Sequence, residues 1–326
     1  MKKLRVGIIG TGGIANAHMR AYQQIPEVEI VGGADIIPGK AREFLDRYEL
    51  ADAKDFTSAS ELLKMDLDAV SVCTYNSTHA ECTVAALEAG VHVLCEKPMS
   101  INSDEAKRMI EAKEKSGKLL MTAHVVRFMS PYVYLKSVVD SCELGKPVHV
   151  IMHRLSEVPR WSWENWMLDE KKSGHVTLDL SVHDIDFAQY VFGQPKEISA
   201  VYHEMKDYSN FVSTNMLYDG FHVETVGGWY NAAIPFHAEY TAIFENGYVE
   251  SRGGKVVKNG EEVSLEVTET SENTGINLSG ADGYSDEIRY FMDCIKNNRE
   301  PERVSPESSL KSVELVEEIL KKAARV

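Results

Sequence analysis

The feature that most constrains the fold is a glycine-rich segment directly after the first apolar run of the chain. Residues 4–9 are rich in valine and isoleucine, and they lead into Gly10-Thr11-Gly12-Gly13-Ile14-Ala15. This segment fits the pattern G-x-G-x-x-G/A, whose first glycine permits a tight turn and whose second lets the backbone approach a pyrophosphate. Small Ala15 lets the next helix, expected at 14–22, pack on the strand with its N-terminus toward the phosphates. The segment predicts a dinucleotide-binding βαβ unit formed by these six residues.

An acidic residue ends the second expected strand. Residues 28–34 form this apolar run, and Asp35 follows it, 20 residues after Ala15. A carboxylate at this distance accepts hydrogen bonds from the ribose hydroxyls of NAD and would repel the 2′-phosphate of NADP. The alternative is a turn residue that closes a strand. No arginine follows Asp35 immediately, but Lys40 and Arg42 are near enough to leave NADP open as the cofactor. We predict that Asp35 binds the cofactor and that NAD is preferred to NADP.

Two further buried strands also end in polar residues. Strand 69–73 is followed by Thr74, Asn76 and His79, and strand 91–94 by Cys95-Glu96-Lys97-Pro98. Open parallel sheets bind ligands at the carboxyl ends of their strands, so these polar residues are expected at one ligand-binding edge. The proline makes a rigid turn, on which Lys97 can hydrogen-bond a substrate hydroxyl or carbonyl. A solvated surface turn is the alternative for so short a motif. We expect cofactor contacts from Thr74, Asn76, His79, Glu96 and Lys97.

The order of the expected elements predicts an α/β chain of two domains. Strands and helices alternate up to residue 124, which is typical of a Rossmann fold, a doubly wound parallel sheet with helices on both faces. Beyond a helix at 130–143, residues 197–267 contain short apolar runs separated by Asp219-Gly220, Asn246-Gly247, Gly253-Gly254 and Asn259-Gly260. Such dipeptides between apolar runs are strong hairpin signals. We therefore predict a dinucleotide-binding domain, residues 1–124, and a substrate-binding and oligomerisation α+β domain, residues 125–326, with a large, mostly antiparallel open sheet.

Two segments of the second domain carry candidate substrate contacts. Trp161, Trp163 and Trp166 lie within six residues of one another, which suits either a core plug or an aromatic wall for a sugar ring. Asp179 and His183 stand four residues apart and would share one face of a helix. An aspartate that holds a histidine in one tautomer makes a general base. For that pair alone, a helix cap and a satisfied, partly buried histidine would be the simpler interpretation.

Three motifs in this order and spacing resemble the Gfo/Idh/MocA family, named for glucose–fructose oxidoreductase and inositol dehydrogenase. They are the glycine loop, Glu96-Lys97-Pro98 and Asp179-x-x-x-His183, and further matches are Thr74-Tyr75-Asn76-x-x-His79, Arg127-Phe128 and Tyr284-x-x-Glu287-Ile288-x-x-Phe291. Members generally use NAD or NADP to oxidise or reduce a hydroxyl or carbonyl of a sugar, inositol or related polyol. Tyr75, Ser181 and His175 depart from the family pattern, where proline or glycine is usual, and put the substrate preference in doubt.

The resemblance implies that Lys97, Asp179 and His183 are catalytic and that they contact the substrate together with Arg127 and the three tryptophans. His183 would take the hydroxyl proton, Asp179 would orient it, and Lys97 would stabilise negative charge on the same oxygen. The sequence thus predicts an NAD-dependent dehydrogenase acting on CH–OH groups. The alternatives within the family are an NAD-dependent glycosidase with no net redox change and a sugar-sensing regulator without turnover.

Composition excludes some classes of binding partner and predicts the cellular compartment. The formal net charge of −15 argues against nucleic acid and anionic membrane surfaces. Only three residues precede the first strand, so no signal peptide is expected, and no apolar run approaches the roughly 18–20 residues of a membrane span. The five cysteines form no C-x-x-C pattern, which indicates reduced thiols in the cytoplasm and no metal site. An open sheet with one uncovered face predicts a homodimer or homotetramer.

Overall fold

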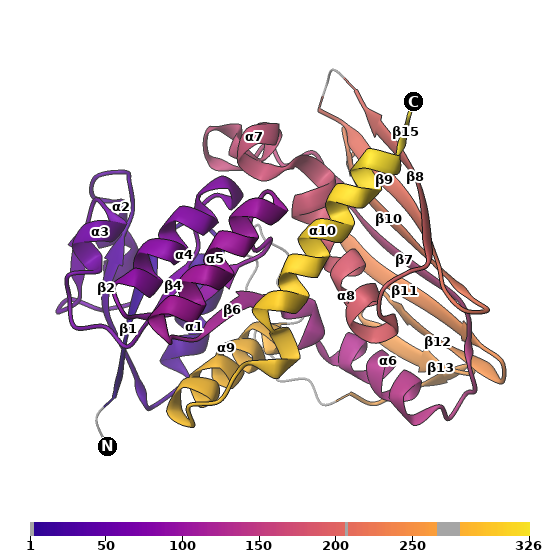
Figure 1. Cartoon of the computed structure of the whole chain (residues 1–326), viewed down its shortest axis with the longest axis horizontal. Helices are drawn as coiled ribbons and strands as arrows, with labels where there is room; N and C mark the ends of the chain where they lie inside the picture. Colours follow the sequence, from indigo (N-terminus) through magenta and orange to yellow (C-terminus); the bar gives the residue numbers. More distant parts are fainter. Residues whose placement is uncertain (1–2, 206–207, 266–280) are drawn as a thin grey trace. The chain divides into compact units, whose positions relative to one another are not determined.

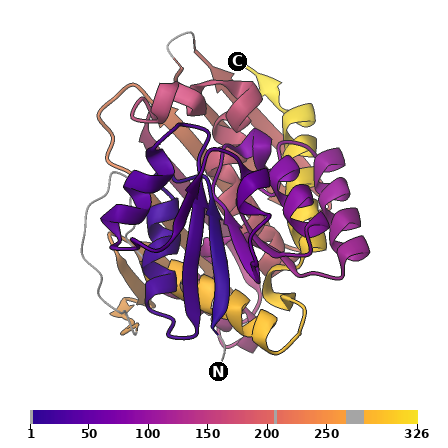
Figure 2. The same cartoon turned by 90° about the vertical axis from the view of Figure 1, so that its left-hand side faces the viewer.

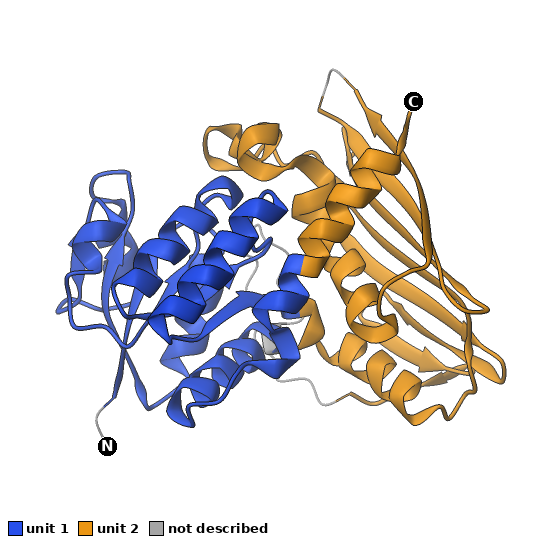
Figure 3. Cartoon of the chain, viewed as in Figure 1, with its two compact units in different colours: residues 1–125, 269–310 blue, residues 126–268, 311–326 orange. Residues whose placement is uncertain are grey.

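The structure is a computed structural model that describes residues 3–205, 208–265 and 281–326. The chain divides into two compact units, residues 1–125 with 269–310 and residues 126–268 with 311–326 (Figure 3). The sequence predicts a second domain that begins at residue 125 and contains the rest of the chain. Helix α9 (Ala281–Lys296) belongs instead to unit 1, because it packs on helix α1 (Ala15–Gln23) and buries Ile288 and Phe291 there.

Unit 1 is built on a six-stranded parallel sheet in the order β3-β2-β1-β4-β5-β6. Figure 2 shows its strands side by side, with helices to either side of them. The strands are β1 (Leu4–Ile9), β2 (Val28–Ala34), β3 (Lys54–Phe56), β4 (Ala69–Val72), β5 (His92–Glu96) and β6 (Leu120–Ala123). The connecting helices are α1, α2 (Lys40–Arg47), α3 (Ala59–Leu62), η1 (Asn76–Thr78), α4 (His79–Glu88) and α5 (Ser103–Ser116). Strand order reverses between β1 and β4, which is where such sheets bind their ligands.

Unit 2 is built on a nine-stranded sheet in the order β14-β13-β12-β11-β7-β10-β9-β8-β15. Its strands are β7 (Pro147–Glu157), β8 (Glu197–Glu204), β9 (Asn210–Leu217), β10 (His222–Tyr230), β11 (His237–Phe244), β12 (Gly247–Arg252), β13 (Lys255–Lys258), β14 (Glu261–Glu262) and β15 (Ala324–Arg325). Most pairs are antiparallel, with hairpins at the predicted turns, whereas β7 with β10 and β8 with β15 pair in parallel. The two sheets confirm the predicted fold class.

Helices cover one face of the unit 2 sheet (Figure 1). They include α6 (Ser130–Ser141), α8 (Val182–Phe192) and the end of α10 (Pro306–Lys322), which begins in unit 1. Side chains on this face are buried, and Tyr240 of β11 donates a hydrogen bond to the carbonyl oxygen of Pro131 at 2.7 Å. Alternate residues point away from the helices and are partly exposed, including Val201 at 37% and Ile243 at 38%.

The remaining described elements are short and mostly connect larger ones. They are η2 (Val125–Arg127), η3 (Trp163–Leu168), α7 (Glu170–Ser173), the π-helix η4 (Thr177–Ser181) and η5 (Glu302–Val304). Among the described residues, no helix is both long and apolar enough to cross a membrane.

Candidate functional site

The glycine loop has the geometry that a dinucleotide requires. Gly10 has a φ of +87°, and a Cβ there would lie 2.6 Å from the carbonyl oxygen of Cys73, so the position excludes other residues. A Cβ on Gly12 would meet no atom within 4 Å, so the space beside the loop is open to a ligand. Helix α1 begins at Ala15, directly after Thr11, Gly12, Gly13 and Ile14, and has no acidic residue in its first turn. The loop therefore fits a pyrophosphate at a helix N-terminus.

Asp35 lies at the end of β2 and is fixed beside this loop. Its Oδ2 accepts hydrogen bonds from the backbone nitrogen of Thr11 at 3.0 Å and from Thr11 Oγ1 at 2.9 Å. Its Oδ1 accepts one from the backbone nitrogen of Ile37 at 3.0 Å, and Lys40 Nζ lies 3.6 Å from Oδ2. The carboxylate is thus held next to the phosphate-binding loop, where a cofactor ribose is expected.

Lys97 stands on a turn at the carboxyl end of β5, two strands from β1 in the same parallel sheet. The Lys97–Pro98 peptide bond is cis. Glu96 was predicted to contact the cofactor, but the structure buries it. Its Oε1 lies 2.9 Å from His18 Nε2, and its Oε2 accepts a hydrogen bond from the backbone nitrogen of Lys97 at 3.1 Å. Because Glu96 points into the unit, its carboxylate supports the turn.

The residues after β4 lie beside the same turn. Asn76 and His79 are buried, and His79 Nδ1 lies 2.7 Å from the carbonyl oxygen of Pro98. Its Nε2 lies 3.3 Å from the carbonyl oxygen of Thr74. Burial lowers the pKa of His79, so the imidazole is neutral at physiological pH and Nδ1–H donates to Pro98. His79 was predicted to bind the cofactor, but both ring nitrogens face backbone carbonyls of unit 1, and it holds the turn instead.

Asp179 and His183 lie on either side of a helix junction in unit 2. Asp179 is buried within the π-helix η4, and His183 is partly exposed in the first turn of α8. The spacing of four residues predicted that the two side chains would share one face of a helix. A π-helical turn shifts the side chains that follow it relative to those before it, and such turns are frequent at functional sites. Asp179 and His183 are therefore carried by adjoining turns of different helical form.

Arg127 was predicted to contact the substrate, but its guanidinium group is 1% exposed and paired within unit 2. Its Nε and Nη2 donate to the two carboxylate oxygens of Asp186 at 2.9 and 2.6 Å. Ser312 donates to the same carboxylate at 2.7 Å. A second buried pair, Arg154 with Asp184, was not predicted. These arginines stabilise α8, the helix that carries His183.

Two family models match consecutive parts of the chain. Residues 4–124 match the model described as oxidoreductase family, NAD-binding Rossmann fold, and residues 132–250 match the GFO/IDH/MocA C-terminal domain. The chain belongs to the Gfo/Idh/MocA family. Its first domain is accordingly an NAD-binding Rossmann domain, and the geometry of the glycine loop and Asp35 fits that cofactor.

Named members of the Gfo/Idh/MocA family resemble this chain over part of their length. Inositol 2-dehydrogenase of Salmonella typhimurium is 32% identical over 204 residues, which are 61% of this chain and 57% of that protein. D-glucoside 3-dehydrogenase of Escherichia coli is 33% identical over 193 residues, 59% of this chain and 55% of that protein. The matches thus span little more than half of these relatives.

The fold is shared over the whole chain with solved structures of the family. An oxidoreductase from Thermotoga maritima superimposes with a TM-score of 0.85 at 23% identity, covering 99% of this chain and 97% of that one. At this identity the comparison establishes the fold.

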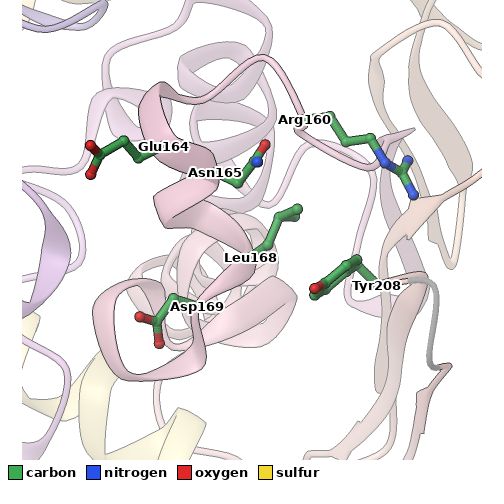
Figure 4. Close-up of a pocket in the computed structure, with 6 residues that line it drawn as sticks. All are labelled: Arg160, Glu164, Asn165, Leu168, Asp169 and Tyr208. Carbon is green, nitrogen blue, oxygen red and sulfur yellow. The ribbon is translucent and has the colours of Figure 1, made fainter.

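The tryptophan segment lies on the surface of unit 2. Trp161 is 63% exposed and Trp163 is 44% exposed, so the core-plug interpretation is wrong for both, and Trp166 is also partly exposed. A pocket of about 320 Å³ adjoins them and is lined by Arg160, Glu164, Asn165, Leu168, Asp169 and Tyr208. Figure 4 shows Asn165 and Leu168 pointing toward the side on which Arg160 and Tyr208 lie. This pocket could not be predicted from the sequence, because Tyr208 comes from the distant β8–β9 hairpin.

Proposed function

We propose that this chain is an NAD-dependent oxidoreductase that acts on a CH–OH group of a sugar, inositol or related polyol. The observation that carries this proposal is the Lys97 turn, which stands at the same edge of one parallel sheet as the glycine loop. Asp179 and His183 supply the rest of the catalytic set. The names of the relatives, an inositol 2-dehydrogenase and a D-glucoside 3-dehydrogenase, support cyclic polyols and sugars as the substrate class.

In the proposed mechanism, a bound NAD supplies the hydride acceptor. His183 accepts the proton of the substrate hydroxyl as a general base, and Asp179 holds the imidazole in the tautomer that can accept it. Lys97 donates a hydrogen bond to the same oxygen and stabilises the negative charge that develops there. Asp35 and the glycine loop hold the ribose and the pyrophosphate.

The test is a panel of inositols, aldoses and ketoses with NAD and with NADP, followed by the absorbance of the reduced nicotinamide. We expect turnover with NAD, and a weaker preference for NAD in Asp35→Ser.

Lys97→Ala and His183→Ala should each lose about 10²–10⁴-fold in rate while NAD still binds. Asp179→Asn should lose less, because the imidazole remains. Near-normal rates in both alanine variants would refute the mechanism and would favour a binding protein.

We further propose that Trp161, Trp163 and Trp166 contact the substrate. Trp161 and Trp163 are exposed and Trp166 is partly exposed on unit 2, beside the pocket that Arg160 and Tyr208 help to line. An indole face can stack on the apolar face of a sugar ring. Tryptophan fluorescence should change when the substrate is added to the NAD complex. Unchanged substrate affinity after phenylalanine substitution at all three positions would remove them from the site.

We also propose that the protein is cytoplasmic and forms a homodimer or homotetramer. All five cysteines are free thiols, which suits a reducing compartment. The sheet face of unit 2 that points away from α6 and α8 contains partly exposed apolar residues on several strands, including Ile151, Phe211 and Val226. A second copy of the chain would bury them.

A further inference from the structure

A chain of four buried polar side chains crosses the interior of unit 1 and ends at the Lys97 turn. Tyr22 and His18 come from α1, Ser71 from β4 and Glu96 from the end of β5. The Tyr22 hydroxyl lies 2.7 Å from Ser71 Oγ, which lies 2.9 Å from His18 Nδ1. His18 Nε2 in turn lies 2.9 Å from Glu96 Oε1. All four side chains are buried, so each contact has to be satisfied inside the protein.

The charge of Glu96 fixes the direction of its hydrogen bond with His18. Burial alone would raise the pKa of Glu96, but the hydrogen bond from His18 and the charge of Lys97 lower it below its ordinary value. An ionised carboxylate only accepts hydrogen bonds, so His18 Nε2 carries a proton and donates it. Burial raises the pKa of Tyr22, so its hydroxyl keeps its proton.

The same contacts join two parts of the proposed site. His18 lies in the first turn of α1, directly after the glycine loop, whereas Glu96 Oε2 accepts the backbone N–H of Lys97 at 3.1 Å. The His18–Glu96 contact therefore connects the helix that would face the pyrophosphate to the backbone of the lysine. The proposed function assigns no role to His18, although His18 is fully buried beside the Lys97 turn.

We propose that His18 and Glu96 are positioning residues that set the place of Lys97 relative to the cofactor loop. This inference rests on the proposed function for the catalytic role of Lys97. Its physical basis is that the hydrogen bond from His18 orients the buried Glu96 carboxylate, whose other oxygen accepts the backbone N–H of Lys97. Displacement of a reacting group by about 1 Å can cost about 10²-fold in rate.

Two conservative substitutions separate the hydrogen bond from the volume of the ring. The amide nitrogen of glutamine reaches the place of a histidine Nε2, whereas that of asparagine reaches the place of Nδ1. His18→Gln therefore keeps a donor for Glu96, and His18→Asn loses it. His92→Asn serves as the control, because His92 lies at the other end of the same strand and accepts a hydrogen bond from the backbone nitrogen of Leu119 at 2.9 Å.

The experiment measures kcat, the KM for NAD and the hydrogen exchange of the Lys97 amide in all three variants of the full-length chain. We expect His18→Asn to lower kcat by about 10- to 100-fold with little change in the KM for NAD, and to accelerate exchange at Lys97. His18→Gln should restore both properties toward those of the unmodified protein. His92→Asn, the same change of residue type elsewhere on β5, should leave both unchanged.

The exchange measurement does not depend on turnover. If no polyol is oxidised by the unmodified chain, the proposed function fails, whereas selective acceleration at Lys97 in His18→Asn still supports the positioning contact. Equal exchange at Lys97 in His18→Asn and His18→Gln would overturn the inference, as would equal kcat values in an active enzyme. Either result would mean that the Nε2 donor does not hold the turn.

Discussion

Among single residues, the two buried arginine–aspartate pairs of unit 2 show how the position of His183 is fixed. Asp184 and Asp186 lie two residues apart on α8, so they point to different sides of the helix. Asp184 binds Arg154 of the sheet, and Asp186 binds Arg127. His183 directly precedes this pair of anchors. The sequence contains both aspartates and both arginines, but it does not show which of them pair. Arg127 and Asp186 are 59 residues apart and Arg154 and Asp184 are 30 apart, so only the fold brings them together.

We predict that Arg127→Met lowers stability by about 3–5 kcal/mol, because it leaves the Asp186 carboxylate buried without its charge partner. Thermal unfolding of the purified variant measures the loss. Arg252→Met is a suitable control, since the Arg252 side chain is 80% exposed and lies 3.8 Å from Glu239 in the same unit. Exposed ion pairs contribute little to stability, so the control variant should have a melting temperature close to that of the unmodified protein. Equal effects of the two substitutions would contradict the structural role of Arg127.

Among the elements, the π-helix η4 is the one whose form depends on a distant strand. Helix propensity and apolar spacing predict helix across Asp179 and His183, and helix is present there. The π-helical turn could not be predicted, because it packs against β10 through Gly227. A Cβ on Gly227 would lie 1.7 Å from Ser181 Oγ, so the turn approaches the strand backbone more closely than any side chain allows.

Gly227→Ala should therefore displace η4 and lower both stability and turnover. Ser181→Gly in the same chain removes the colliding hydroxyl and Cβ, leaving the Ser181 Cα at 3.3 Å from the new methyl group. We expect the double variant to recover much of the melting temperature that Gly227→Ala loses. If the two effects simply add in a double-mutant cycle, the close approach does not determine the turn.

Strand β5 carries a histidine that makes stability depend on pH. Burial and the charge of Lys118 lower the pKa of His92 from 6.5 to about 4. Between these values the unfolded chain binds a proton that the folded chain does not, so stability should fall as the pH drops from 6.5 toward 4. His92→Asn keeps an acceptor for Leu119 and should show a shallower fall in melting temperature over this range. An unchanged slope would show that other groups dominate acid unfolding.

At the scale of the whole molecule, the sequence predicted the two sheets and the ligand-binding edge but not the direction of every side chain. Strands that are buried on both faces have no polar alternation, so the pattern around β5 does not reveal that Glu96 points toward His18. His79 begins helix α4, and its contact with the carbonyl oxygen of Pro98 joins two segments that only the fold brings together. Helix α9 has an apolar stripe that fits any sheet or helix, so its place on α1 could not be predicted from the pattern.

Assembly of the whole molecule can be tested on the sheet face that points away from α6 and α8. Val226 lies on this face of β10, a strand near the middle of the sheet, beside His153 and Ser213 on the neighbouring strands. A stable interface buries about 800 Å² per partner, and a charge near its centre would be costly to desolvate. Val226→Glu should therefore shift the proposed dimer or tetramer toward monomer in light scattering. Val133→Glu introduces the same charge on α6 at a side chain that is 40% exposed, and should leave the assembly intact. If both variants keep the mass of the unmodified protein, copies do not meet on this face.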